Sequence, residues 1–137
     1  MDKKYIINLY KDGIPGKHLN YHTHPDKNPF SGRDIGVFLA VDMDISAVDT
    51  IDDIMYVMVK TKNTQKISIP YITGVSKKLN GRIRELYKIY LPLRKDKNKA
   101  LYEAILKMNI ETAEKYRYNF YVFDKNKGVI RKWIYGN

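Results

Sequence analysis

The segment YHTHPDKNPFSGRD (residues 21–34) gathers metal-binding and proton-handling side chains more densely than any other part of this chain. Alternate residues of an extended strand point to the same face, so His22 and His24 would present two imidazoles side by side. Pro25 cannot donate to a strand ladder and is therefore expected to end the strand. The segment thus predicts a strand that delivers two imidazoles to its end.

The same segment also predicts the start of a helix. Ser31 precedes an apolar run (residues 35–41) and is expected to be the N-cap of a helix that ends near Asp42, with Asp34 in its first turn. Two imidazoles and one carboxylate leave the fourth position of a tetrahedral zinc ion to water, as in catalytic sites. A hydroxyl beside the ion could stabilise an oxyanion. The alternative is that the serine and the aspartate form only a capping box, which needs no metal. The predicted zinc ligands are His22, His24 and Asp34, with Ser31 beside them.

This pattern resembles the signature of the JAMM metallopeptidases, also called JAB or MPN domains. In that family a His-x-His-Pro at a strand end and a Ser-x-x-Asp that opens the next helix hold one zinc ion. The resemblance implies that His22, His24 and Asp34 bind the metal and that Ser31 stabilises the tetrahedral intermediate. It also implies a mixed sheet with flanking helices and zinc-dependent hydrolysis of an amide or isopeptide bond. The implied substrates are peptides or ubiquitin-like proteins, and related domains occur in bacterial toxins and phage proteins.

The chain departs from the family pattern in two respects. The loop between the second histidine and the serine (residues 25–30) is one residue shorter than usual. The family also uses an upstream glutamate as general base, and residues 1–21 contain none. A shorter carboxylate, Asp12, a downstream Glu85 or Glu103 brought in by the fold, or the absence of any base are the open alternatives. A domain of this type without a base would be a non-catalytic binding module.

Length and composition bound the remaining possibilities. A chain of 137 residues is expected to form a single domain, and the resemblance implies one JAB/MPN-like domain over residues 1–137. A complete gene product, a domain shortened at its N-terminus and the terminal module of a longer protein all fit. The absence of cysteine excludes disulfides, cysteine-ligated zinc and a thiol nucleophile. Neither a secretory signal nor an apolar run of about eighteen residues is present, which predicts a soluble protein. A cytoplasmic protein and a secreted effector both fit.

Charge is unevenly distributed along the chain. Residues 1–59 carry six Lys/Arg and nine Asp/Glu, whereas residues 60–137 carry nineteen and six. The basic half could receive an acidic protein partner. With its interleaved tyrosines it could also bind nucleic acid by phosphate neutralisation and stacking, although a solvated lysine-rich helix face is the plainer interpretation. The tyrosines in question are Tyr87, Tyr90, Tyr102, Tyr116, Tyr118 and Tyr121.

The remaining elements predict an α+β fold with a mixed, largely antiparallel sheet and flanking helices. An acidic stretch (residues 42–53) resembles a calcium loop only faintly, because Ala47 replaces the required glycine and the final glutamate is missing. It is therefore predicted to be a solvated loop. The other expected elements are strands at 3–11 and 17–24, strands at 54–60 and 66–73, a loop at 74–81, helices at 82–93 and 98–116, and a hairpin of 120–123 with 129–133.

Overall fold

The computed structural model describes residues 19–137. The strand expected at 3–11, Asp12 and the first two residues of the strand expected at 17–24 lie outside this range. The elements, in chain order, are β1 (Leu19–Thr23), α2 (Gly32–Ala40), β2 (Ile45–Asp49), β3 (Ile54–Val59), the short 3-10 helix η1 (Ile69–Tyr71), α3 (Ile72–Arg94), α4 (Lys97–Tyr116), β4 (Asn119–Asp124) and β5 (Val129–Trp133).

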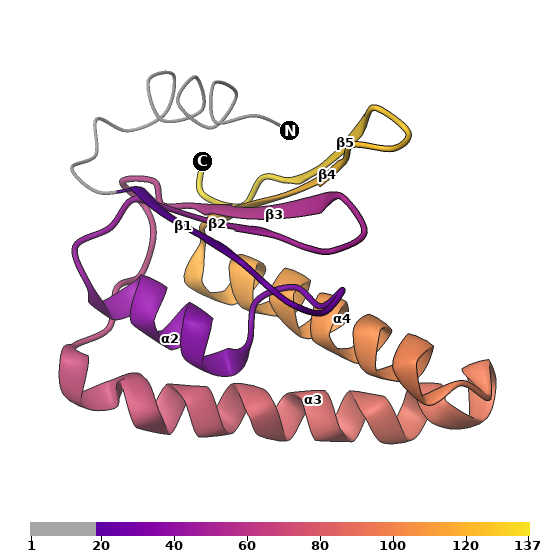
Figure 1. Ribbon diagram of the computed structural model, residues 1–137. Helices are drawn as coiled ribbons and strands as arrows, with labels where there is room; N and C mark the ends of the chain where they lie inside the picture. Colours follow the sequence, from indigo (N-terminus) through magenta and orange to yellow (C-terminus); the bar gives the residue numbers. More distant parts are fainter. Residues whose placement is uncertain (1–18) are drawn as a thin grey trace.

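The five strands form one mixed sheet in the order β1-β2-β3-β4-β5. Strand β1 pairs in parallel with β2, and the other three pairings are antiparallel. Helices α2, α3 and α4 lie together on one side of the sheet (Figure 1). The predicted α+β class and largely antiparallel sheet are therefore confirmed.

The prediction of a solvated loop over residues 42–53 is wrong, because this stretch contains β2 in the interior of the sheet. Residues 45–48 are buried, and Asp49 forms an ion pair with the Lys125 ammonium at 2.7 Å. The aspartates at both ends of the stretch dominate its composition and hide a run of four buried residues. A strand that is buried on both faces also lacks the alternation by which strands are recognised.

The strand predicted at 66–73 and the loop predicted at 74–81 are also wrong. Pro70 lies in η1, which leads directly into α3, and Gly74 and Gly81 both lie inside that helix. Proline is well tolerated in the first turn of a helix, so Pro70 begins the helical segment instead of marking an edge strand. The β-branched residues around it favoured a strand locally, and tertiary packing of the helix overrides that preference.

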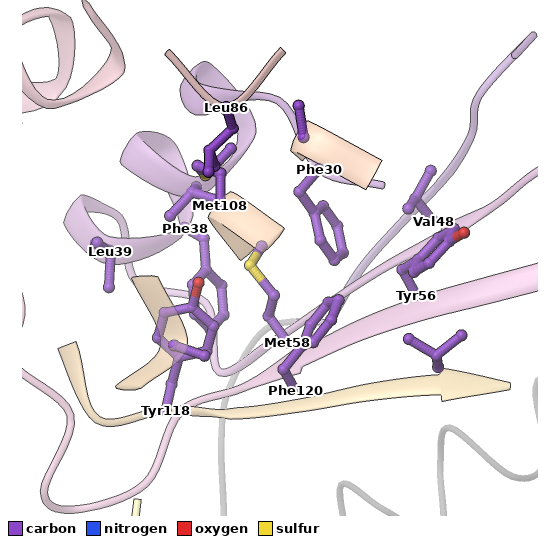
Figure 2. Close-up of a cluster of buried hydrophobic side chains, with 14 residues drawn as sticks. Phe30, Phe38, Leu39, Val48, Tyr56, Met58, Leu86, Met108, Tyr118 and Phe120 are labelled. Atoms are coloured by element: carbon purple, nitrogen blue, oxygen red, sulfur yellow. The ribbon is translucent and has the colours of Figure 1, made fainter. Parts of the chain in front are cut away.

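The main core lies between the sheet and the helices. Figure 2 shows aromatic side chains from α2, β3 and β4 meeting there. The rings of Phe38 and Tyr118 meet edge to face with centroids 5.3 Å apart, and those of Tyr56 and Phe120 are stacked at 6.4 Å. Since side chains alternate across a strand, a second buried cluster lies on the opposite face of the sheet. It consists of Ile45, Ala47, Met55, Val57, Val59, Tyr121 and Phe123.

Two glycines allow α2 to pack closely on α3. A Cβ at Gly32 would lie 2.7 Å from the carbonyl oxygen of Ser76, and one at Gly36 would lie 3.0 Å from the Ser76 hydroxyl. Larger residues would push the helices apart. The approach fixes the start of α2, and with it the side chains of its first turn.

The C-terminal elements follow the predictions closely. Helix α4 begins one residue before its predicted start, and β4 and β5 form the expected hairpin, with Gly128 in the left-handed region at φ 64°. None of the helices within residues 19–137 combines the length and the hydropathy needed to cross a membrane.

Candidate metal centre

The two histidines lie at the end of β1, as predicted. His22 belongs to the strand, and the His24 backbone N–H donates to the Asp49 carbonyl at 2.9 Å, so the extended pairing with β2 continues one residue beyond Thr23. Both side chains therefore project to the same side, with ring centroids 4.9 Å apart.

The start of α2 brings a carboxylate to these rings. The Asp34 backbone N–H donates to the Ser31 hydroxyl at 3.1 Å, and the Ser31 N–H donates to Asp34 Oδ2 at 2.9 Å, which completes the capping box. The same Oδ2 lies 3.4 Å from His24 Nε2. A carboxylate oxygen has two lone pairs, so capping and metal binding can use one atom together. The capping box and the metal site are thus compatible rather than alternatives.

Hydrogen bonds fix the orientation of both imidazoles. His22 Nδ1 lies 3.1 Å from Asn20 Oδ1, and His24 Nδ1 lies 3.0 Å from the Asn28 carbonyl oxygen. A carbonyl oxygen only accepts, so His24 Nδ1 carries the hydrogen, and in a neutral ring its Nε2 then holds a lone pair. With the Asn20 amide oxygen facing His22 Nδ1, the neutral His22 ring has the same tautomer. The two Nε2 atoms are 3.1 Å apart. In these tautomers two Nε2 lone pairs and a carboxylate oxygen face one another, an arrangement that a cation between them would stabilise.

Two of the three distances between these atoms match a small tetrahedral ion. Metal–nitrogen bonds of about 2.0–2.1 Å place neighbouring tetrahedral ligands about 3.3 Å apart. The Nε2–Nε2 distance of 3.1 Å and the Nε2–Oδ2 distance of 3.4 Å bracket that value, and one ligand atom from each of His22, His24 and Asp34 lies within 4.8 Å of the others. These three residues could hold a metal ion.

Burial prepares His22 for this role. The His24 and Asp34 side chains are 17% and 27% exposed. Burial lowers the pKa of His22, and the Asp34 carboxylate only partly opposes this effect while His24 adds to it. A lowered pKa keeps the imidazole neutral, which is the form that binds metals. Similar hydrogen-bonded partners orient the ligands of known metal sites.

One residue that supports the site was not found from the sequence. Asn109, fully buried in α4, donates to the Phe30 carbonyl at 2.9 Å and accepts from the Phe30 N–H at 3.3 Å. It thereby anchors the loop between His24 and Ser31 from 79 positions away in the sequence. The only local indication is an amide on the apolar face of a helix. Such an amide must find partners when buried, but nothing local says which.

Within the described part of the chain, the ligand group contains no second carboxylate that could act as a general base. The cluster of three contains only one carboxylate, that of Asp34. Glu85 pairs with Arg82 at 3.1 Å, and Glu103 pairs with Arg94 at 2.7 Å. Both glutamates proposed from the sequence are thus engaged on the helices. The alternatives that stay open are Asp12, which lies outside residues 19–137, and the absence of any base.

The tyrosines of the basic half contribute mainly to packing. Tyr118 and Tyr121 are buried. The half-buried tyrosines of α3 and α4 pack against the main core, namely Tyr87, Tyr90, Tyr102 and Tyr116. Binding of nucleic acid or of an acidic protein by this half stays a prediction.

Comparisons of the chain with protein-family models, with curated proteins and with solved structures gave no significant match.

Proposed function

We propose that the protein is a zinc-dependent hydrolase of amide or isopeptide bonds, of the JAMM type, with a peptide or ubiquitin-like protein as its substrate. The observation that carries this proposal is that His24 Nε2 lies 3.1 Å from His22 Nε2 and 3.4 Å from Asp34 Oδ2. Three protein ligands leave one position for water, the arrangement of a catalytic zinc site.

The side chains around this point suit acyl transfer. A zinc ion held by the three ligands would lower the pKa of its water to about 7 and polarise the scissile carbonyl. The Ser31 Oγ accepts the Asp34 N–H, so the hydroxyl hydrogen remains available to donate to a developing oxyanion. The proton of the attacking water would pass to a carboxylate, for which Asp12 is the remaining candidate.

A second function, a non-catalytic metal-binding module, is favoured by one observation. Within residues 19–137, the ligand group has no carboxylate other than that of Asp34. In a module of this kind, the metal stabilises the fold and the basic C-terminal half binds an acidic protein or nucleic acid.

Elemental analysis of the purified protein tests the metal site. We expect about one zinc per chain in the wild type and none in His22→Ala or Asp34→Asn. Asparagine keeps an oxygen that can accept the Ser31 N–H, so Asp34→Asn removes the charge while preserving the cap. Asp26→Asn changes a carboxylate outside the ligand group and should retain zinc. A wild type that takes up no zinc even after metal addition would overturn the proposal.

Activity separates the two functions. A hydrolase should cleave members of a peptide and isopeptide library, read by mass spectrometry, and should lose cleavage on chelation and regain it with zinc. Ser31→Ala is expected to lower kcat by about 100- to 1,000-fold while zinc is retained, as for loss of an oxyanion donor. A zinc-loaded protein that cleaves no library member would support the binding module instead.

A further inference from the structure

A cavity of about 720 Å³ opens beside the loop that follows His24. Its walls come from three separate segments: residues 25–28 of that loop, residues 51–54 at the turn between β2 and β3, and the first turns of α4 (residues 96–102). The volume lies within the range of about 300–1,000 Å³ that is usual for ligand sites. The cavity was not apparent from the sequence, because its walls meet only in the folded chain.

The cavity contains apolar side chains that are only partly covered. Ile51 is 66% exposed and Leu101 is 37% exposed, and both line the space. Beside them, Tyr102 is fixed by a hydrogen bond of 3.3 Å from the buried Tyr56 hydroxyl, which holds this wall against the sheet. An apolar group that covered these side chains would gain free energy in proportion to the area removed from water.

Each of the three walls also contributes a carboxylate, namely Asp26, Asp52 or Asp96. One oxygen of each is fixed by a local hydrogen bond: from the Asn28 N–H, from the Thr50 hydroxyl and from the first N–H groups of α4, respectively. Within residues 19–137, none of the three forms an ion pair, and the second oxygen of each accepts no hydrogen bond from a described group. These second carboxylate oxygens favour a cationic ligand.

Two lysines, Lys27 and Lys99, line the same cavity. Their ammonium groups sit on flexible four-carbon stems and can turn to solvent, whereas the local hydrogen bonds hold the carboxylates in place. The fixed charge that a ligand meets is therefore negative, although the chain as a whole carries a net charge of +10.

The shape of the site favours a chain-like ligand. A second hollow of about 200 Å³ shares Ile54 and Tyr102 with the cavity and continues toward Arg131 on β5. In the other direction, the loop wall begins at Pro25, directly after His24, and Asn28 both lines the cavity and accepts the His24 Nδ1–H. A ligand in the cavity thus contacts the loop that orients a metal ligand.

We propose that this cavity binds a polypeptide segment in which a lysine or arginine stands next to an apolar residue. The apolar side chain covers Ile51 and Leu101, and the cation is held by the free oxygens of Asp52, Asp96 and Asp26. Binding of the segment does not require the metal. The role of the cavity as a substrate subsite beside the metal centre rests on the proposed hydrolase function.

Titration with defined peptides, followed by NMR of the isoleucine and leucine methyl groups, tests the proposal. The probe is the blocked hexapeptide Gly-Ser-Leu-Lys-Gly-Ser, with norleucine and glutamate versions in place of its lysine. We expect the lysine peptide to shift the methyl signals of Ile51 and Leu101 and to bind about tenfold or more tightly than the norleucine peptide, which corresponds to the loss of one charge contact. The glutamate peptide should bind more weakly still.

Matched variants locate the binding. The double variant Asp52→Asn with Asp96→Asn keeps the local hydrogen bonds, since an amide oxygen accepts as a carboxylate oxygen does and asparagine is an equally good helix cap at position 96. It should lose the preference for lysine over norleucine. Glu114→Gln, an exposed change on α4 outside the cavity, should keep it. Ile51→Ala should weaken binding of every peptide, whereas Ile89→Ala, an exposed change on α3, should not. Equal binding of the lysine and glutamate peptides, or no shift at Ile51 and Leu101, would overturn the proposal.

The same peptide titration on His22→Ala tests the cavity independently of the metal site. Peptide binding that persists in this variant supports the cavity whatever the metal content of the wild type. A wild type that holds zinc but shows no methyl shifts overturns the cavity proposal and leaves the metal site intact.

Discussion

A charged side chain lies at each end of helix α2, and the two side chains differ in how many of their hydrogen-bonding positions are already occupied. At the N-terminus, Asp34 is 27% exposed, caps the helix and faces two imidazoles. At the C-terminus, the ammonium of Lys60, a residue only 2% exposed, donates to the Val41 carbonyl at 2.8 Å and to the Met43 carbonyl at 2.6 Å. Both placements agree with the helix dipole, which favours an anion at the first turn and a cation at the last.

The difference lies in the hydrogen-bonding capacity that remains. The Lys60 ammonium has three donors, gives two to carbonyls and lies 4.8 Å from the centre of the Phe38 ring, so it is enclosed and nearly saturated. The Asp34 carboxylate is partly open to solvent and its Oδ2 is directed at His24 Nε2. Burial and nearly complete hydrogen bonding make the Lys60 charge structural. The Asp34 carboxylate still has lone pairs that could bind a metal ion.

The largest expected effect is the selective loss of metal stabilisation. Zinc at about 100 times its Kd should stabilise the wild type by about 2.7 kcal/mol, measured as a rise in Tm on zinc addition. His24→Ala should abolish this rise, because the tetrahedral set loses one ligand. Lys60→Met should preserve it despite a lower starting Tm. Loss of the zinc response in Lys60→Met would mean that the two ends of α2 are not independent.

Gly32→Ala tests how the first turn of α2 is held in place. The new methyl group would lie 2.7 Å from the Ser76 carbonyl oxygen, and overpacking of this kind costs about 1–3 kcal/mol. Gly74→Ala is the matched control, because a Cβ there meets nothing within 4 Å and should stabilise α3 by roughly 0.5–1 kcal/mol. Urea unfolding measures both. Equal effects of the two substitutions would show that contact with α3 does not position the ligand-bearing turn.

We expect Lys60, at the C-terminal end of α2, to make the free energy of unfolding depend on pH. Burial, assisted by the charge of Lys66 and opposed by Asp44 and Asp42, lowers the pKa of Lys60 to about 8. The unfolded chain keeps this proton up to its ordinary pKa near 10.5, so between these values the unfolded state binds more protons. The contribution of Lys60 to stability therefore rises with pH through this window. Relative to Lys60→Met, the wild type should gain about 2 kcal/mol between pH 8 and 10. A flat difference in unfolding free energy would contradict the lowered pKa.

The smallest effect is expected from the cap itself. Ser31→Ala removes the acceptor for the Asp34 N–H and should cost about 1 kcal/mol in urea unfolding, whereas Ser31→Thr should cost little. Zinc content should be unchanged in both variants, because the hydroxyl is not one of the three ligands. A Ser31→Ala protein without zinc would show that the cap is needed to hold Asp34 in register with the histidines.

Structural features that depend on residues close together in the sequence were predictable. The strand end at His24, the N-cap at Ser31 and the turn at Gly128 each depend on a few neighbouring residues whose backbone preferences are strong. Strand β2 was missed because its burial comes from neighbours on both faces, and the start of α3 was missed because local β-propensity conflicts with packing against α2. The cavity and the role of Asn109 have no local pattern at all.

The sequence by itself determined the α+β class, the strand that ends in two histidines and the helix that begins with a capping box. These features follow from side-chain periodicity, from proline and from caps, all of which act within a few residues. Only the tertiary structure decided that the two Nε2 atoms and the Asp34 carboxylate meet, that Asn109 anchors the loop and that Lys60 closes the far end of α2. Those outcomes depend on contacts between segments distant in the chain, where close packing and the need to satisfy buried polar groups select one arrangement.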